Sequence, residues 1–157
     1  MGNVFFISDT HFHHKNIIKF RGEGRFKTVE EHDEFLIENW NKTVNKNDKV
    51  FHLGDFSFKD LSVADRLNGL KVLVLGNHDF FKPAELAKHF HRVYGCLLYK
   101  GYFLTHVPVF IDDYSWRGEK NIHGHLHSHK LDTGKHINVC CDHTDYTPIS
   151  FDEIKAL

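Results

Sequence analysis

The chain has 157 residues, of which 41% are hydrophobic and 15 are Phe, so it can bury a sizeable core and is not a disordered sequence. Its net charge of −1 argues against tight nonspecific binding to long nucleic acid, and no apolar run approaches the roughly 20 residues that span a bilayer. We expect one domain over residues 1–157, with no membrane partner.

The first half of the chain alternates strand-like and helical patterns. Thr28 has the position of a helix N-cap, with Glu31 three residues later to complete a capping box. Apolar residues at helical spacing then predict a helix from about Val29 to Val44. The other segments expected here are strands at Val4–Ile7, Lys49–Leu53 and Lys71–Leu75, and helices at His13–Phe20, Asp60–Leu67 and Ala84–Phe90.

The second half is mostly strand-like. We expect strands at Val93–Leu98, Tyr102–Leu104, Lys120–His123 and Ile137–Cys141. Lys100-Gly101 would form a tight turn between the first two of these. Residues 108–119 form a loop, and a last turn runs from Asp152 to Leu157. Alternating elements followed by strands favour an α/β sandwich of two sheets.

Three cysteines, Cys96, Cys140 and Cys141, are present without Cys-x-x-Cys spacing. An odd number in this arrangement predicts neither a disulfide framework nor a thiolate zinc site, and it favours a reducing, cytoplasmic compartment. The N-terminus starts almost directly with strand-like residues, so we expect no signal peptide. Several of the 15 His are expected on the surface or behind the site: His32, His89, His91, His136 and His143.

Side chains that can bind metals follow five of the expected strands. They are Asp9 and His11, Asp55, Asn77 with His78 and Asp79, His106, and His125 with His127. In open α/β sheets, ligands bind in the crevice beyond the carboxyl ends of the strands. Asp9-x-His11 and His125-x-His127 also have the period-2 spacing that turns both side chains of an extended pair the same way. The pattern predicts one shared metal site.

The number and type of donors indicate two ions. Seven nitrogen and oxygen donors are expected, more than the four ligands of a structural zinc. The set is Asp9, His11, Asp55, Asn77, His106, His125 and His127. Two ions that share a carboxylate would use all seven, and mixed imidazole, carboxylate and amide ligation suits Mn, Fe or Zn. We expect two divalent ions, Mn²⁺ first, with Fe, Zn, Ni or Mg as alternatives.

Such a centre suits displacement at phosphorus. Two ions roughly 3.5–4 Å apart lower the pKa of a bridging water and neutralise the phosphoryl oxygens. The leaving oxygen still needs a proton, and His78 lies beside a ligand without being needed as one. We therefore expect His78 to be the catalytic acid and Asp79 to orient its ring from the second shell. The alternative is that His78 only supports the metal ligands and takes no part in catalysis.

Together, Asp9-Thr10-His11, Gly54-Asp55, Gly76-Asn77-His78-Asp79, His106 and Gly124-His125-Leu126-His127 resemble the motif series of the calcineurin-like metallophosphoesterase superfamily, in order, from residue 4 to about 127. The resemblance implies a four-layer αββα sandwich of two mixed sheets flanked by helices, and a dinuclear centre. It further implies that His78 is catalytic and that Asp55 bridges two ions. One ion would take Asp9, His11 and His127, and the other Asn77, His106 and His125.

Departures from the family pattern narrow the substrate. Gly54-Asp55 is followed by Phe56-Ser57-Phe58-Lys59-Asp60, without the Arg of phosphoprotein-directed branches. The chain resembles small single-domain bacterial and phage-encoded members, so a bacterial cytoplasm, or a host cytoplasm for a phage protein, is implied. We expect a small phosphate ester as the substrate, such as a nucleotide, a cyclic phosphate or a nucleic-acid end. His14, Arg21 and Arg25 could contact its phosphate or lie on the surface, and Trp116 could stack on a base or close the core.

The resulting expectation is a metal-dependent phosphodiesterase that uses in-line attack by a metal-bridging hydroxide, with no obligate protein partner. A phosphomonoesterase of the same fold is the nearest alternative. A non-catalytic metal-binding scaffold is the alternative from another class. A nucleic-acid-binding module would need a positive field that the net charge does not supply.

Overall fold

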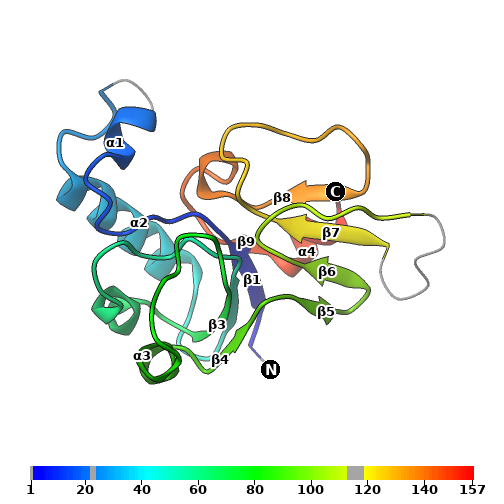
Figure 1. The fold of residues 1–157 in the computed structure, drawn as a ribbon, viewed down its shortest axis with the longest axis horizontal. Coiled ribbons are helices and arrows are strands. Elements are labelled where there is room, and N and C mark those ends of the chain that lie inside the picture. The colour runs from blue at the N-terminus through cyan, green and yellow to red at the C-terminus, as the bar shows by residue number, and fades with distance from the viewer. Residues whose placement is uncertain (1, 22–23, 113–118) are drawn as a thin grey trace.

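The structure is a computed structural model that describes residues 2–21, 24–112 and 119–157 (Figure 1). Its elements within these residues are β1 (Val4–Ile7), α1 (Ile17–Phe20), α2 (Val29–Thr43), β2 (Lys49–His52), the 3₁₀ helix η1 (Ser62–Arg66), β3 (Leu70–Val74), α3 (Pro83–His89), β4 (Arg92–Tyr94), β5 (Leu97–Tyr99), β6 (Tyr102–Leu104), β7 (Lys120–His123), β8 (His136–Asn138), the 3₁₀ helix η2 (Cys141–His143), β9 (Ile149–Ser150) and α4 (Phe151–Lys155). The expectation for Trp116 lies outside the described residues.

Two sheets form the centre of the fold. The first has the strand order β4-β3-β2-β1-β9, with β1 to β4 parallel and β9 antiparallel to β1. The second has the order β5-β6-β7-β8, in which β6, β7 and β8 are parallel and β5 is antiparallel to β6. The predicted pair of mixed sheets is confirmed. Because neighbouring strands run the same way, their carboxyl ends meet at a common edge.

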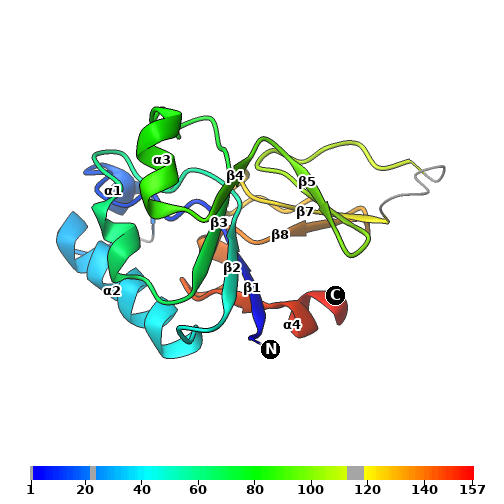
Figure 2. The same ribbon diagram turned by 90° about the horizontal axis from the view of Figure 1, so that it is seen from below.

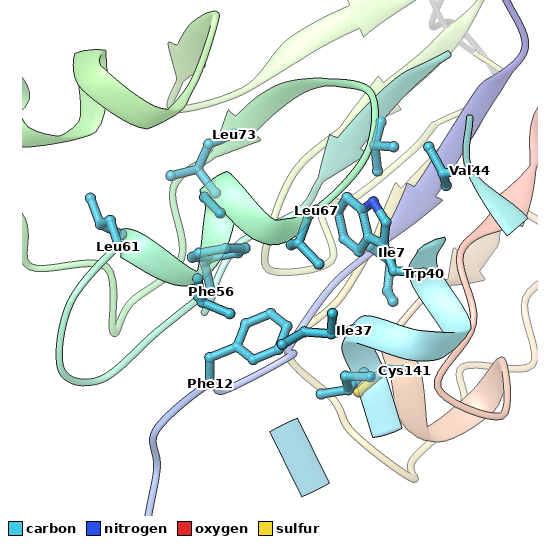
Figure 3. Close-up of a cluster of buried hydrophobic side chains, with 14 of the residues drawn as sticks. Ile7, Phe12, Ile37, Trp40, Val44, Phe56, Leu61, Leu67, Leu73 and Cys141 are labelled. Atoms are coloured by element: carbon cyan, nitrogen blue, oxygen red, sulfur yellow. The ribbon is translucent and has the colours of Figure 1, made fainter. Parts of the chain in front are cut away.

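Helices cover the outer side of the first sheet. In Figure 2, α1, α2 and α3 lie on one side of β1 to β4, and the second sheet lies on the other. Trp40 of α2 is buried, packs over the sheet and donates its indole N–H to the Asn68 carbonyl at 2.9 Å. Ile7, Val44 and Leu73 belong to the same cluster, which Figure 3 shows closely packed. This core fixes the strands that carry the first group of site residues.

A second core fills the space between the two sheets. Phe6 and Phe51 stack at a centroid separation of 5.4 Å on the first sheet, and Leu104 and Ile122 of the second sheet join the same cluster. Ile154 of α4 is buried among them. β1 and β3 are buried on both sides, since Ile7 and Leu73 belong to the first core and Phe6 and Val72 to the second, which explains the apolar and β-branched composition of these two strands.

Local sequence signals account for most element ends. Thr28 accepts a hydrogen bond from the Glu31 N–H at 3.1 Å, so the expected N-cap is confirmed, although the Glu31 carboxylate accepts from Lys27 rather than from the cap. Lys100 and Gly101 both have positive φ, as the expected tight turn requires. The single strand expected at Val93–Leu98 is wrong, because the segment divides into β4 and β5, which belong to different sheets.

No helix within the described residues is long and apolar enough to cross a membrane. All three cysteines are free, with Cys96 exposed and Cys140 and Cys141 buried. The expectation that they form no disulfide framework is confirmed.

Candidate metal centre

The loops that follow β1, β2 and β3 meet the loops that follow β6 and β7 where the two sheets come together. The Asp9 N–H donates to the Gly54 carbonyl at 2.9 Å and the His11 N–H to the Asp55 carbonyl at 3.0 Å, which joins the first two loops. The Gly124 N–H donates to the His106 carbonyl at 2.9 Å and joins the loops of the second sheet. The backbone thus carries the expected residues to one place.

The first group of side chains is centred on Asp9. Its Oδ1 lies 3.8 Å from His11 Nε2 and 3.9 Å from His127 Nε2, and His11 Nε2 is 3.8 Å from Asp55 Oδ2. These separations are too long for hydrogen bonds. They suit ligands of one ion, since two atoms each about 2.0–2.2 Å from a metal are at most about 4.4 Å apart. Asp9, His11 and Asp55 together form a group that could hold a metal ion.

The second group is centred on His106. Its Nε2 lies 2.9 Å from Asn77 Oδ1, 3.2 Å from His125 Nδ1 and 3.4 Å from Asp55 Oδ2. Asp55 therefore belongs to both groups. All seven side chains expected as metal ligands are brought together, in the two sets that the family resemblance implies.

Unpartnered polar atoms in this cluster fit a metal centre. Asp9 is fully buried and His11 is 3% exposed, yet Asp9 Oδ1 and both His11 ring nitrogens have no hydrogen-bond partner among the described residues. Leaving a buried donor or acceptor unsatisfied costs roughly 1–3 kcal/mol, and such groups are rare in folded proteins. Divalent cations bind carboxylate and imidazole atoms of this kind, so these residues fit the metal ions that the family resemblance implies.

Carbonyl and carboxylate groups behind the cluster orient two of its imidazoles. His106 Nδ1 donates to the Leu53 carbonyl at 2.8 Å, which leaves Nε2 free toward Asp55 and Asn77. His127 Nδ1 faces Asp142 Oδ2 at 3.4 Å, which leaves Nε2 facing Asp9. Partners of this kind set the tautomer and ring direction of metal-binding histidines.

The backbone at the cluster is strained. Asp9, His11, Asp55, His125 and His127 all have positive φ, between 47° and 67°. This left-handed region is unfavourable for residues other than Gly, and such strain gathers at functional sites. With an extended backbone, these side chains would point in other directions.

Two glycines of the motifs are required by close approach. A Cβ at Gly76 would lie 2.3 Å from Asp55 Oδ1, and a Cβ at Gly124 would lie 2.3 Å from Asp9 Oδ2. The Gly76-Asn77-His78-Asp79 and Gly124-His125-Leu126-His127 loops can therefore press against the two carboxylates only without a side chain at these positions.

The two carboxylates of the cluster and His11 have protonation states that favour a cation. Burial acts to raise the pKa of Asp55, but the neighbouring His106 imidazole lowers it below the ordinary carboxyl value, and Asp9 is shifted in the same direction by His11 and His106. Burial lowers the pKa of His11. Both carboxylates are thus ionised and His11 is neutral near pH 7, which are the protonation states that bind metals.

His78 lies at the edge of the cluster. Its backbone N–H donates to Asp55 Oδ1 at 2.8 Å, and its ring is 5.9 Å from that of His11, centroid to centroid. Together with His11, His125 and His127, His78 lines a pocket of about 640 Å³. The ring can therefore reach a ligand in this pocket.

Asp79 does not play the role expected for it. Its carboxylate accepts hydrogen bonds from the backbone N–H groups of Gly76, Asp55 and Phe56 at 2.8–2.9 Å, and no described contact joins it to the His78 ring. Burial raises the pKa of this carboxyl. Asp79 thus ties the loop after β3 to the loop after β2, and it positions Asp55 and His78 through the backbone.

The alternative that Arg21 lies on the surface is wrong, and its contact with a phosphate stays a prediction. The side chain is 1% exposed, and its terminal nitrogens donate to the carbonyls of Asp9 and Thr10 and contact His32 and Asp142. His32 is likewise buried, behind the site and not on the surface. Arg21 is a structural cation beneath the loop after β1.

Arg25 and His14 complete the set of residues expected near a phosphate. Arg25 pairs with the exposed Asp145 at 2.9 Å and packs over the Tyr146 ring. His14 lines the pocket, where its ring stacks on Phe58.

Asp142 and Cys140 are site neighbours that sequence reasoning missed. Cys140 Sγ donates to Asp142 Oδ2 at 3.0 Å and lies 3.9 Å from His127 Nδ1. The signal was present, because Asp142 follows the segment Ile137–Cys141 just as Asp9 and Asp55 follow their strands. It marks a sixth strand-like segment that is followed by a side chain able to bind a metal or orient its ligands.

Comparisons with known proteins found a matching family model and similar proteins. The family model described as "Calcineurin-like phosphoesterase" matches residues 2–156. The protein MJ1445 of Methanocaldococcus jannaschii, named as uncharacterized, is 36% identical and is matched over 100% of this chain and 92% of its own length. The Gene 66 protein of Mycobacterium phage L5 is 31% identical over 88% of this chain and 83% of its own length. The crystal structure of AQ665 from Aquifex aeolicus, titled a protein of unknown function, has a TM-score of 0.78 at 31% identity and 99% coverage of both chains.

Proposed function

The chain belongs to the calcineurin-like phosphoesterase family, a family of metal-dependent phosphoesterases, and from this premise we propose that it is a phosphodiesterase with a dinuclear metal centre. Its substrate in this proposal is a small nucleotide-like or cyclic phosphate ester. Asp9, His11 and His127 would hold one ion, Asn77, His106 and His125 the other, and Asp55 would bind both.

One observation carries the proposal. Asp55 Oδ2 lies 3.8 Å from His11 Nε2 and 3.4 Å from His106 Nε2, so a single carboxylate oxygen borders both groups of donors. A carboxylate in this position can serve two cations at once, as two-metal phosphoesterase chemistry requires. Because it is shared, Asp55 couples the two halves of the site.

Each protein group has a definite part in this reaction. When bound, two divalent ions supply a nucleophilic water near neutral pH and neutralise charge on the phosphoryl oxygens. His78 is then the candidate acid, since its ring lines the pocket beside the donors without being one of them. It would give its proton to the departing ester oxygen. Asp79 joins the loops that carry Asp55 and His78, so the His78 ring would keep a fixed position beside the bound phosphate.

The pocket supports a small substrate. Its volume of about 640 Å³ lies within the range of about 300–1,000 Å³ typical of small-molecule sites. An ester of nucleotide size fits such a space.

The test is hydrolysis of chromogenic esters by the protein supplied with Mn²⁺. We expect bis-p-nitrophenyl phosphate to be cleaved faster than p-nitrophenyl phosphate, with activity lost on chelation and in Asn77→Ala. A faster rate on the monoester would replace the phosphodiesterase by a phosphomonoesterase. Absence of cleavage of either ester by protein that retains two ions would contradict an enzymatic role and favour a metal-binding scaffold.

A further inference from the structure

The pocket beside the metal centre is lined by two chemically different kinds of side chain. Some are the imidazoles of the candidate centre. Others are apolar, and Ile17, Phe20, Phe58 and Leu126 are here called the apolar wall. A phosphate held at the imidazoles would leave the rest of its ester near these apolar side chains.

Phe58 is fixed in place by aromatic contacts. Its ring stacks on His14 at a centroid distance of 4.1 Å and an interplanar angle of 11°, and it lies 5.0 Å from the His78 ring. It is nevertheless 39% exposed. One part of this ring is thus packed while another part lines the pocket.

Phe20 is almost free of the protein core. It is the last residue of α1 and is 75% exposed, although it lines the pocket. Figure 1 shows α1 at one end of the molecule, beyond the loop that follows β1. An exposed apolar side chain that lines a pocket with polar groups is available to contact a ligand bound there.

The charges of the pocket limit what can bind. Among the described residues that line it, Arg21 is the one Lys or Arg, and both of its terminal nitrogens are already engaged by carbonyls, His32 and Asp142. The described lining residues therefore offer no terminal Lys or Arg nitrogen that is free to bind a second phosphate. The arrangement suits a ligand with one phosphate and an uncharged, flat, largely apolar group.

We infer that the apolar wall binds the base of a nucleotide whose single phosphate lies at the metal centre, with Phe20 and Phe58 as the specificity-determining residues. This inference rests on the proposed function and narrows its substrate class to esters of nucleoside monophosphates. Every base presents a π-face to an aromatic side chain, so stacking gives affinity without a strong sequence preference.

The test is a binding comparison that needs no turnover. Calorimetric titration of the Mn²⁺-loaded protein with AMP and with ribose 5-phosphate separates the base from the sugar phosphate. We expect AMP to bind about tenfold more tightly or better, which corresponds to the lower part of the range for a base stacked on an aromatic ring. Phe20→Ala should weaken AMP binding roughly fivefold or more and leave ribose 5-phosphate unchanged.

Phe110→Ala is the matched control. Phe110 is 89% exposed and is not among the lining residues, so both ligands should bind this variant as they bind the unchanged protein. Equal affinity of the unchanged protein for AMP and ribose 5-phosphate, or a Phe20→Ala variant with full AMP affinity, would overturn the inference. ADP that binds tenfold more tightly than AMP would overturn the single-phosphate part.

The two proposals fail separately. A protein that prefers AMP but cleaves no phosphate ester contradicts the proposed function and keeps the base site. A protein that cleaves diesters but binds AMP and ribose 5-phosphate equally keeps the proposed function and loses the base site.

Discussion

The Asp55 carboxylate and the His106 imidazole come from different sheets, and their Oδ2 and Nε2 atoms lie 3.4 Å apart. Asp55 follows β2 of the first sheet and His106 follows β6 of the second. Correct packing of the core between the sheets is therefore a condition for the site. The residues that hold the loops in place can therefore be tested by mutation as directly as the expected metal ligands.

His78→Ala tests the proposed acid. Loss of the proton donor should slow esters with alkoxide leaving groups by roughly 10²–10⁴-fold, because an alkoxide needs protonation as it departs. Esters of p-nitrophenol should slow less than about tenfold, since this leaving group is stable as an anion. The measurement is kcat on a pair of diesters that differ only in the leaving group. Equal slowing of both would remove His78 from this role.

Asp142→Asn tests the orientation of His127. Removing a carboxylate behind a metal-binding histidine typically costs 10–100-fold in metal affinity, and we expect a loss of that size at one of the two ions. Competition with a fluorescent chelator measures it. Asp145→Asn is the control, because Asp145 is exposed and pairs with Arg25. Affinity as high as that of the unchanged protein would show that Asp142 does not position His127.

Asp79→Ala tests the link between the loops after β2 and β3. Three backbone N–H groups lose their acceptor, so the free energy of unfolding should fall by about 3 kcal/mol or more, at roughly 1 kcal/mol for each hydrogen bond. Urea denaturation without metal gives the value. Asp132→Ala, at an exposed position, should change it little. An Asp79→Ala variant with the same free energy of unfolding as the unchanged protein would mean that the two loops keep their positions without this carboxylate.

His52 should make the fold sensitive to acid. It is fully buried, its Nε2 lies 2.9 Å from Thr10 Oγ1, and burial lowers its pKa from 6.5 to about 3. Below pH 6.5, His52 takes up a proton in the unfolded chain but stays neutral in the folded chain. Its contribution to stability is therefore present above pH 6.5 and is lost as the pH falls toward 3. The slope is about 1.4 kcal/mol per pH unit.

The corresponding measurement compares unfolding free energies at several pH values in the presence of a chelator. Between pH 6 and pH 4, the free energy of unfolding of His52→Leu should depend less steeply on pH than that of the unchanged protein. The difference in slope should correspond to about one proton, or about 1.4 kcal/mol per pH unit. His91→Gln, at an exposed position, should retain the full slope. Parallel curves for His52→Leu and the unchanged protein would contradict burial of a neutral imidazole.

Strand-end residues made most of the candidate site predictable. Asp9, Asp55, Asn77 and His106 each follow an apolar run, and parallel pairing brings such ends to one edge. The helix cap at Thr28 and the Lys100-Gly101 turn were also predictable, because each depends on residues close together in the sequence.

Features that depend on long-range packing were not predictable. Burial of Arg21 is decided by carbonyls of the loop after β1 and by Asp142, which is 121 positions away. The division of Val93–Leu98 into β4 and β5 depends on which sheet each half joins, and no local signal separates them. The role of Asp79 depends on backbone N–H groups of a loop more than 20 residues earlier, which a side-chain motif does not reveal.

The number of metal ions per chain tests the central claim most directly. Elemental analysis of protein dialysed against Mn²⁺, together with anomalous scattering from its crystals, should find two ions on either side of Asp55. Asp55→Ala should lose affinity for both. A single ion with a closed set of ligands, or an Asp55→Ala variant that still binds two ions tightly, would contradict a shared dinuclear centre.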